Sequence, residues 1–263
     1  MTRAPDRCQV WWATSGGSTG EGLLSDAERS RAGRFRCAEG RLRFVTARVL
    51  LRLLLADRLG VPPAAVPLVA GCRVCGASGH GRLRLDGDPT DVSFSVTRRG
   101  ARVGVAMTDG RAVGVDVETA DDRGDPARAA LAAEALGPSE LAAYRRLPVA
   151  DRGRAMTRWW TRKEAVLKAT GDGLGFPPAK LRVSAPGSPA ALVAWEEPSA
   201  ATASRPPVRL QDVDPAPGYV GCVAVLGSHP IRVGELDGDE VLRGGELVRP
   251  SRERRSVGRA VQG

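Results

Sequence analysis

The sequence is poor in lysine, histidine and aromatic residues. Lysine and arginine together number 39, but only Lys163, Lys168 and Lys180 are lysine; histidine occurs 2 times, and aromatic residues make up 4% of the chain. So few aromatic rings argue against a surface that stacks nucleic-acid bases, and we expect no nucleic-acid partner. The net charge of +9 suits an anionic partner, such as a phosphorylated small molecule or an acidic protein.

Long hydrophobic runs are also absent. No window approaches the roughly 20 apolar residues that a membrane span needs, so we expect no membrane partner. Residues 1–15 lack the uninterrupted apolar core of a signal peptide, and we expect a cytoplasmic protein. With 263 residues, of which 42% are hydrophobic and 26% charged, the chain has room for one large globular domain or two medium ones.

Cysteine is present in an odd number. The 5 cysteines of a protein expected in the cytoplasm argue against a disulfide framework. Cys72 and Cys75 form a lone C-x-x-C pair, and His80 follows. A closed structural zinc site needs four ligands, so these three residues leave zinc binding open.

Apolar periodicity predicts two long helices and several short ones. The first long helix covers residues 39–59 and ends at Gly60; the arginines interspersed in it are interpreted mostly as a solvated face. The second covers residues 151–170 and ends at Gly171. Ser25 and Glu28 form the capping-box pattern of a further helix, and residues 127–135 and 139–147 are helical by composition.

Short β-strands are predicted at residues 92–96, 101–107, 113–117, 181–184, 191–195, 208–210 and 219–226. Asp109-Gly110 is a hairpin signal, so the first three strands are predicted to form an antiparallel meander. From His229 onward the chain is rich in charge and glycine and is predicted to be disordered.

Two carboxylates share one face of the strand Val113–Glu118. Because side chains alternate across a strand, its three valines are expected in the core, with Gly114, Asp116 and Glu118 on the opposite face. Two carboxylates that close repel unless a cation lies between them, and Mg²⁺ takes one or two carboxylates plus substrate phosphates. Gly114 is interpreted as room for a bulky ligand. The alternative is the solvated face of an edge strand.

The second long helix carries an acid and two bases. Trp160, Glu164 and Lys168 are four residues apart and therefore share one side, whereas Lys163 lies about 100° around the axis. A glutamate at the edge of a buried tryptophan patch could reach a metal held by Asp116 and Glu118. The alternative is a Glu–Lys pair on an exposed helix.

Taken together, these segments resemble the Sfp-type 4′-phosphopantetheinyl transferases. The family motif (V/I)-G-(V/I)-D stands here as Val113-Gly-Val-Asp116, and (F/W)-(S/C/T)-x-K-E-(S/A)-x-x-K stands as Trp160-Thr-Arg-Lys-Glu-Ala-Val-Leu-Lys168. Gly171-Asp-Gly173 and Pro217-Gly-Tyr219 also match, and the resemblance spans residues 24–226. The pair of motifs is specific, whereas either motif alone would be weak.

The resemblance implies an α+β fold. It is a pseudo-dimer of two similar α/β lobes, each a helix packed on a small, mainly antiparallel sheet, with coenzyme A between them. We expect a monomer, with an N-terminal lobe at residues 1–111, a C-terminal lobe holding both motifs at residues 112–228, and a disordered tail at residues 229–263.

The implied activity is a magnesium-dependent transfer. The 4′-phosphopantetheine arm of coenzyme A passes to a serine of an acidic acyl or peptidyl carrier protein, and 3′,5′-ADP is released. Fatty-acid, polyketide and nonribosomal-peptide carriers all remain possible.

The resemblance also assigns site residues. Asp116, Glu118 and Glu164 would hold Mg²⁺ on the coenzyme A pyrophosphate. Glu164, or alternatively Glu140, would help to deprotonate the serine, and Lys168 would stabilise the charge on the departing nucleotide; with Asp116 they form the catalytic set. The residues expected to bind coenzyme A are Arg31, Arg34, Arg36, Arg82, Ser95, Thr97, Lys163 and Lys168.

Two positions depart from the family pattern. Gly81-Arg82-Leu83 lacks the proline of G-(K/R)-P, and Ser95-Val96-Thr97 lacks the histidine of S-H-S that contacts coenzyme A phosphates. Losing one charge-assisted hydrogen bond costs about 1.5–3 kcal/mol. Two alternatives follow: a degenerate homologue that binds coenzyme A or a carrier protein without transfer, and a basic nucleic-acid-binding protein with zinc at Cys72, Cys75 and His80.

Overall fold

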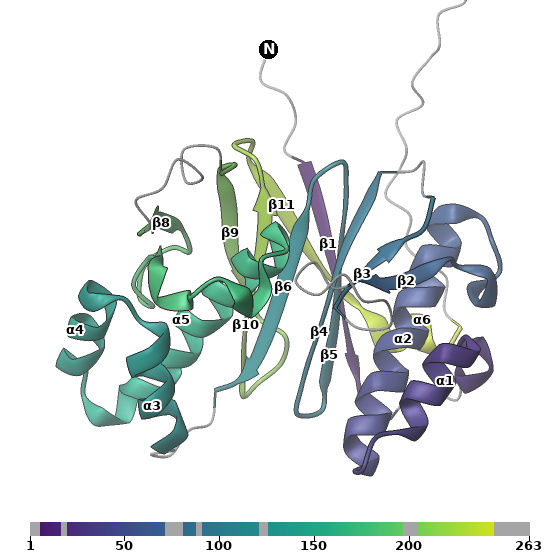
Figure 1. Cartoon of the computed structure of the whole chain (residues 1–263), viewed down its shortest axis with the longest axis horizontal. Coiled ribbons are helices and arrows are strands. Elements are labelled where there is room, and N and C mark those ends of the chain that lie inside the picture. The colour runs from purple at the N-terminus through teal and green to yellow at the C-terminus, as the bar shows by residue number, and fades with distance from the viewer. Residues whose placement is uncertain are drawn as a thin grey trace, which may run out of the picture.

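The computed structural model describes residues 6–16, 20–71, 81–87, 91–120, 126–196 and 205–244, and it shows a mixed α+β protein whose helices flank a central pair of sheets (Figure 1). The α+β prediction is confirmed. Cys72, Cys75 and His80 lie outside the described residues. Within the described residues, no helix has the length and apolar character needed to cross a membrane.

All helices of the described residues except the last begin and end close to the predicted positions. The helices are α1 (Asp26–Gly33), α2 (Ala38–Leu59), α3 (Pro126–Ala135), α4 (Pro138–Arg146), α5 (Val149–Thr170) and the short α6 (Gly238–Leu242). Ser25 and Glu28 form the predicted capping box of α1. The long helices α2 and α5 end where Gly60 and Gly171 adopt the left-handed conformation, with φ of 68° and 78°.

The strands form two main sheets and two small ribbons. The four-stranded sheet has the order β11-β1-β5-β4, the three-stranded sheet the order β6-β10-β9, and the ribbons are β2-β3 and β7-β8. All pairs are antiparallel except β1 with β11. The strands are β1 (Asp6–Thr14), β2 (Leu68–Gly71), β3 (Arg82–Leu85), β4 (Val92–Arg99), β5 (Arg102–Asp109), β6 (Val113–Thr119), β7 (Leu181–Val183), β8 (Leu192–Trp195), β9 (Val208–Val213), β10 (Tyr219–Leu226) and β11 (Ile231–Asp237).

The two main sheets pack face to face between two helical layers. On β1, Trp11 faces the core shared with α2, whereas Val10 and Trp12 face the second sheet. On β10, Val223 faces the first sheet, whereas Cys222 faces the core shared with α5. The layers therefore run α2, first sheet, second sheet, α5, as Figure 1 shows from right to left. Because β10 is buried on both faces, its sequence is a short, nearly continuous apolar run.

The predicted three-stranded meander is wrong at its last strand. β4 and β5 pair as expected, but β6 leaves β5 and pairs with β10 in the other sheet. Gly110 still forms a turn, and its N–H donates to Asp91 O at 2.8 Å. The valines of β6 account for the change, because they fill the core between the two sheets instead of continuing the first.

The disordered tail predicted after His229 is wrong for residues 231–242. β11 pairs in parallel with β1, and Trp12 Nε1 donates to Glu235 Oε2 at 2.8 Å. Helix α6 follows at once; Asp239 accepts from Thr14 N at 2.8 Å, and Val241 enters the core beside α2. The alternation of apolar and charged residues in β11 is that of an edge strand, so its high charge did not indicate disorder.

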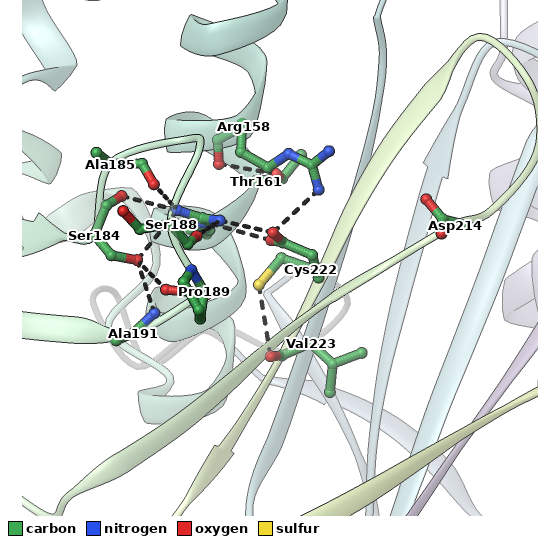
Figure 2. Close-up of polar contacts among 12 residues, drawn as sticks. Arg158, Thr161, Ser184, Ala185, Ser188, Pro189, Ala191, Asp214, Cys222 and Val223 are labelled. Atoms are coloured by element: carbon green, nitrogen blue, oxygen red, sulfur yellow. Dashed lines mark hydrogen bonds and ion pairs between the residues drawn. The ribbon is translucent and has the colours of Figure 1, made fainter.

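The fully buried Arg162 connects α5 to β9, an edge strand of the second sheet. Arg162 makes a bidentate ion pair with Asp212 of β9, at 2.6 and 3.1 Å. Its remaining N–H groups donate to the backbone oxygens of Ser184, Ala185 and Ser188, which Figure 2 shows gathered in the loop after β7. A buried guanidinium with this many partners is a structural feature.

Gly114 does not make room for a ligand, contrary to the sequence interpretation. A Cβ atom at this position would lie 2.0 Å from Ala165 O and 2.5 Å from Ala169 N, both on the backbone of α5. Gly114 therefore allows β6 and α5 to pack at a distance that any side chain would prevent.

We predict that Gly114→Ala lowers the free energy of unfolding by about 3 kcal/mol or more, because the added methyl meets backbone that cannot rotate away. Gly22→Ala is the matched control, since a Cβ atom there meets nothing within 4 Å and should change stability by no more than about 0.5 kcal/mol. Denaturant unfolding measures both. Equal stability of the two variants would contradict the close-packing role.

Candidate functional site

A cavity of about 620 Å³ opens where β4 of the first sheet lies beside β6 of the second. Its walls come from α1, α2, β3, β4, β6, the C-terminal end of α5 and the glycine-rich loop after it. Both sequence motifs therefore reach this one cavity, since Asp116 lies on β6 and Lys168 on α5. We call Asp116 with the neighbouring Glu164 the acidic end of the site, and Arg31, Arg48 and Arg98 the basic end; all of these except Glu164 line the cavity.

Asp116 is the centre of the acidic end and is 6% exposed. Lys168 Nζ donates to Asp116 Oδ1 at 2.6 Å and to Val115 O at 3.0 Å. Thr97 Oγ1 donates to the same Oδ1 at 3.2 Å. Oδ2 is also buried, but it has no hydrogen-bond partner. The carboxylate thus has one occupied oxygen and one oxygen open to a cation.

Glu164 adds a second unsatisfied carboxylate oxygen. It lies one helical turn before Lys168, and its Oε1 is buried without a hydrogen-bond partner. Burial raises the pKa of Glu164; the negative charge of Asp116 raises it further, and Lys168 opposes the shift. Two neighbouring buried carboxylates of this kind are unfavourable unless a proton or a cation joins them.

The predicted third carboxylate, Glu118, lines the cavity but is paired with an arginine. Glu118 Oε2 forms an ion pair with Arg99 Nε at 2.9 Å on the half-exposed rim. Among the residues that the structure describes, no group of three or more His, Cys, Asp or Glu side chains is placed so that it could hold a metal ion. Asp116 and Glu164 still fit Mg²⁺, because this ion commonly takes one or two protein carboxylates and completes its shell with substrate phosphates and water.

Three arginines form the basic end around a single aromatic ring. The guanidinium carbons of Arg31, Arg48 and Arg98 lie 5.6, 5.1 and 5.9 Å from the centroid of the Phe44 ring. All three arginines line the cavity. Cation–π contacts of this kind stabilise each guanidinium without neutralising it.

Glu28 is the carboxylate that faces Arg48 of this basic cluster, and its negative charge opposes the repulsion by Arg31 and Arg98. Arg48 is 8% exposed, and its buried Nε has no hydrogen bond; the nearest carboxylate oxygen is Glu28 Oε1 at 3.6 Å. Burial lowers the pKa of Arg48 to about 10, with Arg31 and Arg98 contributing by repulsion. Burial and the charge of Arg31 also lower the pKa of Arg98. An anion bound here would offset this repulsion.

Arg48 and Arg98 were not predicted as site residues. The arginines of α2 were interpreted mostly as a solvated face, which is wrong for Arg48 and for Arg52, whose exposed fractions are 8% and 2%. A signal was present: Arg48 follows Val45 by three residues and therefore lies on the apolar side of the helix. Arg98 lies near the end of an alternating strand, where nothing in the sequence distinguishes it from Arg99.

Comparison with known proteins matches one segment of this chain to a protein family. Residues 112–209 match the 4′-phosphopantetheinyl transferase superfamily. The match covers less than half of the chain. The matched segment contains both motifs, and with them Lys168 and both carboxylates of the acidic end, Asp116 and Glu164.

Three curated transferases are similar over more than half of this chain. The 4′-phosphopantetheinyl transferase HetI of Nostoc sp. is 34% identical over 151 residues, or 57% of this chain. A phosphopantetheinyl transferase of Thraustochytrium sp. is 30% identical over 165 residues, and a putative 4′-phosphopantetheinyl transferase of Synechocystis sp. is 29% identical over 154 residues. The matched regions span 61%, 55% and 59% of those proteins, respectively.

Most residues predicted for coenzyme A binding line the cavity, and three do not. Arg31, Arg82, Ser95, Thr97 and Lys168 are at its walls. Arg34 and Arg36 are exposed and lie outside the lining, because α1 ends at Gly33 and only Arg31 is turned inward.

Lys163 is the third exception, and the structure places it in the core. Its side chain is 0% exposed; Nζ pairs with Glu140 Oε2 at 2.5 Å and donates to Leu181 O at 2.6 Å and Pro178 O at 2.9 Å. Glu140, the alternative base, also accepts from Gly137 N and Val183 N. This buried pair connects α4, α5 and β7. We therefore propose neither Lys163 as a contact to coenzyme A nor Glu140 as the base.

We predict that Lys163→Met lowers the free energy of unfolding by about 3–5 kcal/mol, because it leaves the Glu140 carboxylate buried without its counter-charge. Glu140→Gln in the same chain should recover part of this loss, since glutamine keeps an acceptor and removes the charge. Denaturant unfolding of both variants measures the difference. A Lys163→Met protein within about 1 kcal/mol of wild type would contradict the structural role.

Proposed function

We propose that this protein is a Mg²⁺-dependent transferase that moves the 4′-phosphopantetheine arm of coenzyme A to a serine of an acyl or peptidyl carrier protein and releases 3′,5′-ADP. The observation that carries the proposal is the polarity of the cavity. Asp116, which has one unsatisfied carboxylate oxygen, lines the same cavity as Arg31, Arg48 and Arg98. Glu164, whose pKa is affected by the charge of Asp116, has a second unsatisfied oxygen. Coenzyme A carries a pyrophosphate, which binds through a cation, and a separate phosphate monoester, which suits the arginines.

The acidic end would hold Mg²⁺ through Asp116 Oδ2 and Glu164 Oε1. Glu118 is a third candidate ligand if Arg99 releases it. The bound ion would neutralise charge on the pyrophosphate oxygens during transfer. Lys168, which donates to Asp116 in the structure, would add positive charge at the departing nucleotide.

In the proposed reaction the serine Oγ attacks the phosphorus that carries the pantetheine arm. A new P–O bond to Oγ forms, the bond from that phosphorus to the bridging oxygen breaks, and 3′,5′-ADP leaves with the electron pair. A general base must take the serine proton, and we propose Glu164 for this role because it lies beside Asp116 and has an unsatisfied carboxylate oxygen.

The remaining parts of the proposal rest on the resemblance. They are two similar lobes divided near residue 112, a monomeric state and an acidic carrier. A net charge of +9 is complementary to such a carrier. A cytoplasmic location is also part of the proposal, independent of the resemblance.

We predict that the protein, given Mg²⁺ and coenzyme A, adds the mass of one phosphopantetheine arm to at least one member of a panel of apo-carrier proteins. Asp116→Ala and Glu164→Ala should abolish the gain while keeping the fold, and removal of Mg²⁺ by a chelator should do the same. Glu39→Ala, at a carboxylate whose side chain is 86% exposed on α2, is the control and should transfer normally.

Intact-mass spectrometry of the carrier measures transfer, and the circular dichroism of each variant checks its fold. Coenzyme A binding without transfer to any carrier would replace the proposal with that of a degenerate homologue. Val96 motivates this alternative, because it lines the cavity where the family pattern has a histidine.

The basic end is proposed to take the 3′-phosphate of coenzyme A. Arg31, Arg48 and Arg98 then supply the positive charge that the missing imidazole would have contributed. We predict that Arg98→Ala weakens coenzyme A binding about 10- to 100-fold, the loss of one charge-assisted hydrogen bond. The same variant should bind 3′-dephospho-coenzyme A as wild type does, because that ligand lacks the group the arginine contacts.

Titration calorimetry with the two ligands measures the difference, and Arg34→Ala, exposed and outside the cavity, is the matched control. Equal losses for both ligands would show that Arg98 acts on some other part of coenzyme A. Val96→His should tighten coenzyme A binding; an unchanged affinity would mean that residue 96 does not face the phosphates.

A further inference from the structure

Side-chain hydroxyls, instead of a backbone ladder, join the two sheets beside the cavity. Three alternate residues of β4 accept from three alternate backbone N–H groups of β6: Val113 N donates to Ser93 Oγ at 3.2 Å, Val115 N to Ser95 Oγ at 3.1 Å, and Val117 N to Thr97 Oγ1 at 3.2 Å. The spacing of two residues on both strands keeps all three hydroxyls on one face. We call this set the hydroxyl ladder.

Thr97 differs from the other two members of the ladder. Its hydroxyl accepts from Val117 N and also donates to Asp116 Oδ1 at 3.2 Å, and the residue is 4% exposed. A threonine has few side-chain rotamers, because its Cβ is branched. Because one of its lone pairs accepts from a backbone N–H, the O–H is restricted to the remaining directions, one of which leads to Asp116 Oδ1.

The two bonds to Oδ1 decide which oxygen of Asp116 stays open. Lys168 Nζ and Thr97 Oγ1 both donate to Oδ1, and Oδ2 is left buried without a partner. Lys168 makes the shorter bond, but it reaches Oδ1 through a long side chain that is 29% exposed. Thr97 supplies the rigid contact, and it comes from the other sheet.

We propose that Thr97 is a positioning residue that acts through Asp116. Its hydroxyl turns the carboxylate so that Oδ2 faces the cation, and the hydroxyl ladder fixes this orientation to the relative position of the two sheets. The inference takes only one element from the proposed function, which is the presence of a cation beside Asp116. Outer contacts that orient a metal-ligating carboxylate commonly change metal affinity 10- to 100-fold when they are removed.

The test compares Thr97→Val with Ser93→Ala. Valine keeps the shape of threonine and loses both hydroxyl bonds. Ser93→Ala loses one bond of the same ladder, but Ser93 makes no contact with Asp116 among the bonds described and does not line the cavity. Thr97→Ser restores the hydroxyl. The dissociation constant for Mn²⁺, measured from the electron paramagnetic resonance of the free ion with coenzyme A present, is the readout, and thermal unfolding checks each fold.

We expect Thr97→Val to raise the Mn²⁺ dissociation constant about 10-fold or more. Thr97→Ser should stay within about 3-fold of wild type, and Ser93→Ala should leave metal affinity unchanged while it lowers the unfolding temperature. If Thr97→Val does not fold, Thr97→Ala takes its place in the same comparison.

Two results would overturn the inference, and they have different consequences for the proposed function. If Thr97→Val binds Mn²⁺ as wild type does, or no worse than Ser93→Ala, the hydroxyl only ties the sheets together and the proposed function stands. If wild type itself binds no Mn²⁺ in the presence of coenzyme A, the metal part of the proposed function fails and the positioning role fails with it.

Discussion

The close contact between Gly114 and α5 is the constraint on which the site depends. With no side chain at position 114, β6 approaches the helix so closely that Asp116 reaches Lys168 at 2.6 Å and raises the pKa of Glu164. The glycine and the two charged helix residues belong to motifs far apart in the sequence. The contact between β6 and α5 explains the spacing of residues within each motif. Gly114 permits the contact, and Asp116 on the strand then faces Lys168 on the helix.

The site gathers like charges that the protein offsets only in part, through ion pairs such as that of Lys168 with Asp116. Burial and the charge of Asp116 disfavour the ionised form of Glu164, and burial and neighbouring arginines do the same for Arg48 and Arg98. Such arrangements are more common at functional sites than elsewhere. A ligand that brings a cation to one end and a phosphate to the other would relieve both, so the cavity is preorganised for a ligand of mixed charge.

Local features of the sequence predicted most of the secondary structure. The capping box at Ser25, the left-handed glycines after α2 and α5, and the alternation of β6 are decided by neighbouring residues, and all are confirmed. The errors concern contacts between distant residues. The pairing of β11 with β1 joins residues more than two hundred positions apart, and no local pattern announces it.

The site shows the same division between local and distant information. The motifs brought Asp116, Glu164 and Lys168 together correctly, because family resemblance encodes a tertiary arrangement that periodicity does not. Lys163 shares the motif, but it points into the core, where it neutralises Glu140. Helical spacing had already placed it about 100° away from the line of Glu164 and Lys168. The angle indicated the structural role of Lys163 better than its position in the motif did.

Val96 has a different meaning in the structure than in the sequence. The hydroxyls of its neighbours Ser95 and Thr97 were expected to contact the ligand. In the structure both hydroxyls accept hydrogen bonds from backbone N–H groups of β6, and the Thr97 hydroxyl also donates to Asp116. Only the O–H of Ser95 remains for a phosphate. Since the residue between them is apolar, the segment serves mainly to join the sheets and to orient the carboxylate. The arginines around Phe44 must then supply most of the positive charge at that side of the cavity.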